Sequence, residues 1–157
     1  MGAIFRWIRD LWLGKRSLGQ VVERVSATLP QTAAAAIFNI VGGRVLVTSI
    51  IAQVTVVMGA VGNDTKLTAT PTAGTPRDIC AVLDTANYVL GDLLGITGIN
   101  IDAMLPPASA GTLEGQTVGV VLKTGTLDLD CAGNNTGELS WTIHYIPLDA
   151  GAVIQAA

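Results

Sequence analysis

The sequence has few of the side chains that catalysis uses. Its 157 residues include one histidine and two cysteines, and only 13% of them are charged. It contains no glycine-rich phosphate loop and no Gly-x-Ser-x-Gly nucleophile motif. Because enzymes concentrate titratable groups at characteristic spacings, we expect a protein that is not an enzyme and that binds no cofactor.

The few reactive side chains are scattered. Cys80 and Cys131 form no Cys-x-x-Cys pair, which argues against zinc binding and thioredoxin-like chemistry. We expect buried free thiols, and a disulfide between them is the alternative. Alternating polarity places His144 on the polar face of a strand, in a solvated or interface position. Asp128 and Asp130 share a strand face and have the chemistry to bind a cation or act as paired carboxylates, but no third ligand accompanies them.

Long apolar runs are also missing. No stretch reaches the roughly 18 apolar residues that a membrane-spanning helix needs, and the N-terminal region lacks a small-residue cleavage site. We therefore expect a soluble chain without a signal peptide. Half of the residues are apolar, and the charged fraction is about half of the usual 25%. A surface so poor in charge favours association into an oligomer.

The charges are unevenly distributed along the chain. Residues 1–24 hold five basic and two acidic side chains, whereas residues 25–157 hold four basic and ten acidic ones. The first region is therefore +3 and the second −6. An acidic body repels phosphate, so we expect no nucleic-acid binding by the main domain.

The N-terminal region predicts a helical arm over residues 1–30, followed by a β domain over residues 31–157. Apolar residues recur at helical spacing while charged residues take the other side, as in a short amphipathic helix. A second, weaker helical run is predicted to follow it. The first run contains Ile4, Trp7, Ile8 and Leu11, and the second contains Leu18, Val21, Val22 and Val25.

The apolar side of this arm predicts a partner-binding surface. Two of the three tryptophans lie in it, and we expect so much aromatic surface to pack against a partner. The alternatives are the chain's own β domain or the same helix of a neighbouring subunit, another protein, and a membrane surface on which basic residues face outward. The predicted contact residues are Ile4, Phe5, Trp7, Ile8, Leu11 and Trp12.

The body predicts about seven short strands separated by turns. Residues 37–41 and 45–51 flank a glycine turn and predict a hairpin whose second strand continues to 57. Residues 119–122 and 126–131 predict a second pair. Alternation places Leu127, Leu129 and Cys131 on one buried face. Further strands are predicted at 66–70, 78–83 and 138–146, and an exposed loop at 106–111.

Strands without intervening helices predict the fold class. It is mainly β, an antiparallel sandwich or barrel that is jelly-roll-like, with an N-terminal amphipathic helical arm. Which strands pair with which cannot be derived from the alternation.

The body, especially ATLPQTAAAAIFNIVGGRVLVTSII and GELSWTIHYIPLDAGA, resembles small virion proteins of tailed bacteriophages, of the decoration or cement kind. The resemblance covers about residues 27–157 and rests on general texture. It implies a β-barrel or jelly-roll domain, commonly trimeric, bound to the major capsid protein on the outer capsid surface after assembly in the host cytoplasm. A head-fibre base, neck or tail component is an alternative, as is a peripheral membrane protein anchored by the arm. The arm itself has no counterpart in this resemblance.

Overall fold

The computed structural model describes residues 19–106 and 113–157. These residues form strands and connecting loops, with no helix among them. The strands are β1 (Gln20–Thr28), β2 (Ala34–Val41), β3 (Val45–Val56), β4 (Asp64–Pro71), β5 (Arg77–Asp78), β6 (Leu83–Asp84), β7 (Leu93–Gly95), β8 (Val120–Leu122), β9 (Gly125–Cys131), β10 (Glu138–Pro147) and β11 (Val153–Ala156).

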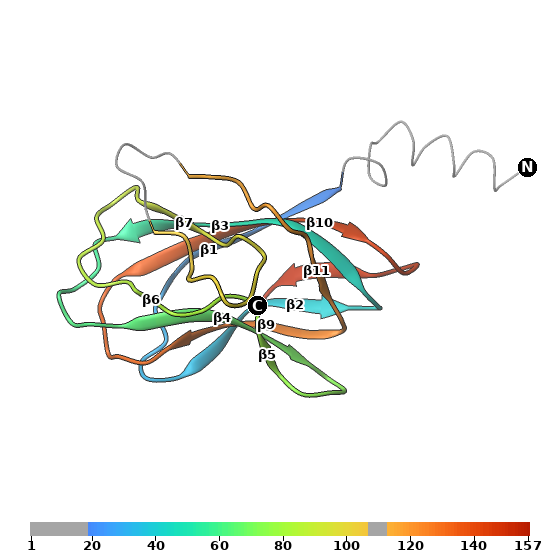
Figure 1. Cartoon of the computed structure of the whole chain (residues 1–157), viewed down its shortest axis with the longest axis horizontal. Coiled ribbons are helices and arrows are strands. Elements are labelled where there is room, and N and C mark those ends of the chain that lie inside the picture. The colour runs from blue at the N-terminus through green and yellow to red at the C-terminus, as the bar shows by residue number, and fades with distance from the viewer. Residues whose placement is uncertain (1–18, 107–112) are drawn as a thin grey trace, which may run out of the picture.

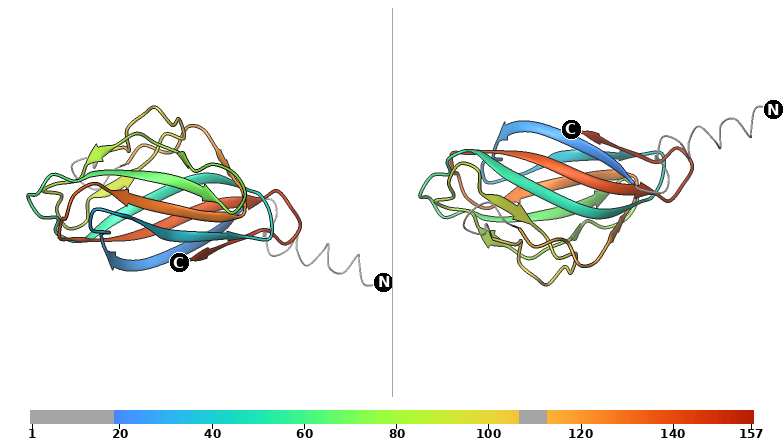
Figure 2. Two further views of the ribbon diagram at one scale, coloured as in Figure 1. Left: turned by 90° about the horizontal axis from the view of Figure 1, so that it is seen from below. Right: turned by 90° about the horizontal axis from the view of Figure 1, so that it is seen from above.

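Two antiparallel sheets pack face to face as a sandwich (Figures 1 and 2). Sheet A has the order β1-β10-β3, and both β7 and β8 pair with the edge of β3 that faces away from β10. Sheet B has the order β11-β2-β9-β4, and both β5 and β6 pair with the far side of β4. The chain passes from β1 in sheet A to β2 in sheet B, and it keeps changing sheet at most later connections.

One edge of each sheet is formed by a strand in two pieces. β7 pairs with residues 51–53 of β3 and β8 with residues 45–47, so the two pieces continue one line. Residues 96–119 leave the sheet between them, and the ends of this insertion meet where the Val118 amide donates to the Thr97 carbonyl at 2.9 Å. β5 and β6 continue one another along β4 in the same way.

The core lies between the sheets and is formed by alternate residues of the long strands. On β10 the predicted inward residues, Leu139, Trp141, Ile143 and Tyr145, are all buried. Leu127, Leu129 and Cys131 face them from β9, as predicted. Ile37 and Phe38 are adjacent and both buried, because a register shift in β2 turns both toward the core.

Both predicted hairpins are wrong. β2 and β3 lie in different sheets, and so do β8 and β9. Each glycine-containing connection therefore crosses from one sheet to the other. At the first crossing the Arg44 amide and guanidinium both donate to Asp149, a partner 105 positions away. Alternation shows which side of a strand is buried but not which sheet the strand joins.

The second predicted helical run is also wrong, because residues 20–28 form β1. This strand pairs with β10, with Gln20 opposite Tyr145 and Thr28 opposite Glu138. Its β-branched valines suit a strand, and the ladder to β10 satisfies their backbone groups along one edge. The predicted boundary at residue 30 therefore places β1, a strand of sheet A, inside the expected arm.

Of the other predicted elements, one is found in part and two fall largely outside the described residues. The single strand predicted at 78–83 is replaced by the short β5 and β6 with buried Ile79 and Cys80 between them. The helix predicted over residues 4–12, and nearly all of the loop at 106–111, lie outside the described residues. In the described ranges no helix is long and apolar enough to cross a membrane.

Candidate interaction surfaces

Large apolar side chains are exposed in two main places on the described surface. The first is the end of the sandwich formed by the β3–β4 loop and residues 84–92, and the second lies on and beside the insertion between β7 and β8. The first group is Val56, Val57, Val61, Val89 and Leu90, and the second is Val82, Ile99, Ile101, Val118 and Val121.

We call the first place the acidic end and define it by residues 56–64, 84–92 and 132–138. Two of its segments run side by side, since the Met58 amide donates to the Tyr88 carbonyl at 2.9 Å and the Asn87 amide donates to the Gly59 carbonyl at 3.0 Å. This pairing places Val57 next to Val89 in register. Leu90, at the tip, is 68% exposed.

Buried asparagines hold the loops of the acidic end in place. The Asn135 side-chain amide donates to the carbonyl of Gly59 at 3.2 Å and to that of Val61 at 2.8 Å. Asn63 accepts a hydrogen bond from the Gly133 amide at 2.9 Å. Because both asparagines are buried, these bonds are shielded from water and fix the shape of the exposed patch.

The acidic end carries four carboxylates and no lysine or arginine. They belong to Asp64, Asp84, Asp92 and Glu138. Asp64 and Asp84 lie directly opposite one another in the β4–β6 pair, an arrangement that like charges disfavour. The amides of Asn63 and Ala86 donate to Asp84 and hold the pKa of that carboxyl below its usual range, so it remains charged at neutral pH.

The opposite end has the reverse charge, and we call it the basic end. Its connections, residues 41–45, 71–77, 122–126 and 147–152, carry Arg44, Arg77 and Lys123 against one carboxylate, Asp149. Arg44 binds Asp149 with its backbone amide and its guanidinium, at 2.7 to 2.9 Å. These bonds and the positive charge lower the pKa of Asp149 to about 2. β1 begins at this end, opposite the acidic end in Figure 1.

Two residues of the second exposed apolar group, Ile99 and Val121, line a groove of about 490 Å³ between the open edges of the two sheets. β8 and residues 98–100 of the insertion line one side, and β5 with the end of β4 lines the other. Arg77 pairs with Ala69, whose side chain packs against the core between the two sheets. Arg77 is therefore on the face of β5 that borders the groove. The groove thus combines an apolar wall with a cationic rim formed by Arg77 and Lys123.

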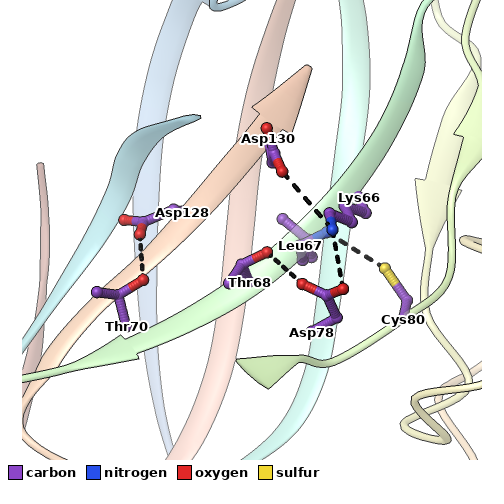
Figure 3. A network of polar contacts seen from close by, with 8 residues as sticks. All are labelled: Lys66, Leu67, Thr68, Thr70, Asp78, Cys80, Asp128 and Asp130. Atoms are coloured by element: carbon purple, nitrogen blue, oxygen red, sulfur yellow. Dashed lines mark hydrogen bonds and ion pairs between the residues drawn. The ribbon is translucent and has the colours of Figure 1, made fainter. Parts of the chain in front are cut away.

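The outer face of sheet B holds the two aspartates that the sequence singled out (Figure 3). Lys66 lies 2.8 Å from Asp78 and 3.7 Å from Asp130, and Asp128 accepts a 2.6 Å hydrogen bond from the Thr70 hydroxyl. The two aspartates therefore bind different partners. Among the described residues no group of three or more His, Cys, Asp or Glu side chains is placed to hold a metal ion.

The remaining reactive residues lie as the sequence predicted. Cys80 and Cys131 are buried and unbonded to one another, and burial raises the pKa of both thiols. Cys80 sulfur accepts a hydrogen bond from the Leu67 amide at 3.3 Å, and His144 is exposed on the outer face of β10.

The predicted contact residues, Ile4, Phe5, Trp7, Ile8, Leu11 and Trp12, lie outside the described residues. The sequence did not indicate the groove or the acidic end. Each is assembled from segments that are far apart along the chain. The signal that was available was the net charge of −6 in residues 25–157, which does not say where the charges gather.

Comparisons with known proteins assign the chain to no family. No family model matches the chain, and no curated protein matches it. Among solved structures, a chain from the "Structure of infectious bursal disease virus Gx strain" aligns with 87% of this chain and 33% of its own length, at 13% identity and a TM-score of 0.23. This chain thus spans about a third of that neighbour's length.

Proposed function

We propose that this chain is a structural component of a virus particle, a capsid decoration protein of the kind found on tailed bacteriophages. It binds the major capsid protein on the outer surface and stabilises the shell through contacts between subunits. The observation that carries the proposal is the order of the strands. β1-β10-β3-β8 facing β2-β9-β4-β5 is the order of a jelly roll, with β11 added beside β2. Jelly rolls are common in viral capsids, although they also form lectins and cupins, so the strand order supports the class by analogy.

The surface supports a role in assembly over a role in catalysis. Exposed apolar side chains gather at the acidic end and along the groove, and such patches mark surfaces that another molecule covers. Each contact is small, but repetition over a symmetric shell multiplies it. A homo-oligomer, expected to be a trimer, bound to capsid subunits uses this kind of surface.

The N-terminal residues supply anchors in this proposal. Trp7 and Trp12 are residue types that dominate the free energy of protein interfaces. Particles of the virus that encodes the chain are assembled with the wild type or with Trp7→Ala and Trp12→Ala combined, and the bound fraction is measured after sedimentation. We expect the variant to detach at least tenfold more readily, while its circular dichroism and thermal unfolding match the wild type.

Equal attachment of the double variant would contradict the role of these tryptophans. Absence of the wild-type chain from the particles would contradict the proposed function as a whole. Flotation of the chain with anionic liposomes, lost in the same variant, would instead favour anchoring on a membrane surface.

A further inference from the structure

The two ends of the sandwich differ in a way that points to how copies of this chain associate. The segments of the acidic end sum to −4 and those of the basic end to +2. Residues 1–18, which precede β1 at the basic end, add four basic side chains and one acidic one. Among the described residues, positive charge therefore gathers at one end of the sandwich and negative charge at the other, and the basic segment is joined to the chain at the positive end. Such a distribution favours contact between unlike ends of two molecules.

We infer that the acidic end is a docking site for residues 1–18 of a second copy of this chain. The inference deepens the proposed function, on which it rests, by naming one contact between neighbouring subunits. It joins the apolar residues of the segment to the valines and leucine of the acidic end, and the basic residues of the segment to its carboxylates.

The chemistry of the two surfaces is complementary. The segment carries Ile4, Phe5, Trp7, Ile8, Leu11 and Trp12 together with Arg6, Arg9, Lys15 and Arg16. The acidic end offers Val57 and Val89 side by side with Leu90 at its tip, and no cation of its own. A bound arginine would relieve the repulsion between Asp64 and Asp84, which face one another in the β4–β6 pair.

The acidic end is also preorganised for binding. Asn135, Asn63 and Asp84 each bind backbone groups of neighbouring loops, so the patch loses little conformational freedom when it is covered.

Geometry favours a second copy over the chain's own segment. β1 has nine residues and spans about 30 Å between the two ends. A segment that starts at the basic end must fold back over this whole length to reach its own acidic end. In a second copy placed end to end, the acidic end lies next to the start of β1, so no such reversal is needed. Such a head-to-tail contact is heterologous, so it closes into a ring or continues as a filament.

Complementation between two variants of the full-length chain tests this directly. One variant, Arg6→Glu with Arg9→Glu, has an altered segment and an intact acidic end. The other, Asp64→Lys with Leu90→Lys, has an intact segment and an altered acidic end. The Asp64 side chain makes no hydrogen bond with another described residue and Leu90 is 68% exposed, so folding should be preserved. Thermal unfolding checks this.

Sedimentation velocity measures association of each variant, alone and mixed. We expect each variant alone to associate at least about thirtyfold more weakly than the wild type. An equimolar mixture should form a dimer and nothing larger, because it has one intact segment facing one intact acidic end. The control is Glu23→Lys with Val21→Lys on β1. It changes the net charge by the same amount as Asp64→Lys with Leu90→Lys and should associate like the wild type.

Several results would overturn the inference. They are a mixture that stays monomeric, an acidic-end variant that associates like the wild type, loss of association in the β1 control, and a wild type that is monomeric at every concentration. None of them bears on whether the chain attaches to virus particles, which is measured separately. The inference and the proposed function can therefore fail independently.

Discussion

The two ends of the sandwich are built by different means. At the basic end a charged pair on the surface, Arg44 and Asp149, joins two loops, and glycines allow the close approach of their backbones. At the acidic end buried asparagines join the loops, and the carboxylates are left without a cation among the described residues. The basic end thus pairs its one carboxylate with a cation, whereas the carboxylates of the acidic end meet no described cation, although Asp84 and Asp92 accept backbone hydrogen bonds. This difference suggests that the acidic end serves association.

The largest expected contrast concerns one glycine at each end. Gly42 has φ of +78°, and a Cβ there would lie 2.5 Å from the Gly151 carbonyl oxygen. Gly62 at the acidic end has no such φ, and its nearest neighbour would be 3.7 Å away. We expect Gly42→Ala to lower the free energy of unfolding by about 3 kcal/mol and Gly62→Ala to change it by less than about 0.5 kcal/mol. Urea unfolding measures both, and equal effects would remove the contrast.

Adjacent asparagines offer a matched pair at the acidic end. Asn135→Ala leaves the Gly59 and Val61 carbonyls without their buried donor, so we expect a loss of about 2 kcal/mol in the free energy of unfolding. Asn134→Ala removes only an exposed contact with Thr32 and should cost less than about 0.5 kcal/mol. If the two variants unfold at the same urea concentration, the buried bonds do not hold these loops.

The charged pair at the basic end should make stability depend on pH. The pKa of Asp149 is about 2 in the folded chain and 3.8 ordinarily, so its carboxylate stabilises the fold above about pH 4. That contribution is lost as pH falls from about 4 to about 2, where the folded chain also binds the proton. Asp149→Asn should therefore melt below the wild type at pH 6 and together with it at pH 2. A constant gap in melting temperature would contradict this assignment.

The smallest effect has the opposite sign. Asp64→Asn at the acidic end removes one of two like charges that face each other across β4 and β6. We expect its melting temperature at pH 7 and low salt to rise by about 1 °C, and the gain to vanish at high salt. A fall in melting temperature would show that Asp64 has a stabilising partner in the isolated chain.

Local pattern was enough to predict much of this fold. Alternation along 138–146 and 126–131 identified which residues of β10 and β9 are buried, because the pleat puts successive side chains on opposite faces. It did not identify sheet partners. The crossing at Gly42 to Arg44 depends on Asp149, which is distant in sequence, and β1 is a strand because β10 is beside it.

The candidate surfaces could not be predicted from the sequence either, because they depend on which strands are neighbours in the sheets. Asp64, Asp84, Asp92 and Glu138 meet at one end only once the sheet order is known, and the groove exists because the outer strands of both sheets are interrupted. The chemistry of residues 4–12 could be read from the sequence, but what they contact depends on these assembled surfaces.

The most direct test of the whole account is the native molar mass of the full-length chain, measured by light scattering after size exclusion over a range of concentrations. The single chain has a mass of 16.2 kDa. A structural protein that assembles through its ends should show a multiple of this mass, about three times it for the proposed trimer, and should fall to a single chain in Asp64→Lys with Leu90→Lys. A mass of 16.2 kDa at every concentration would contradict the account.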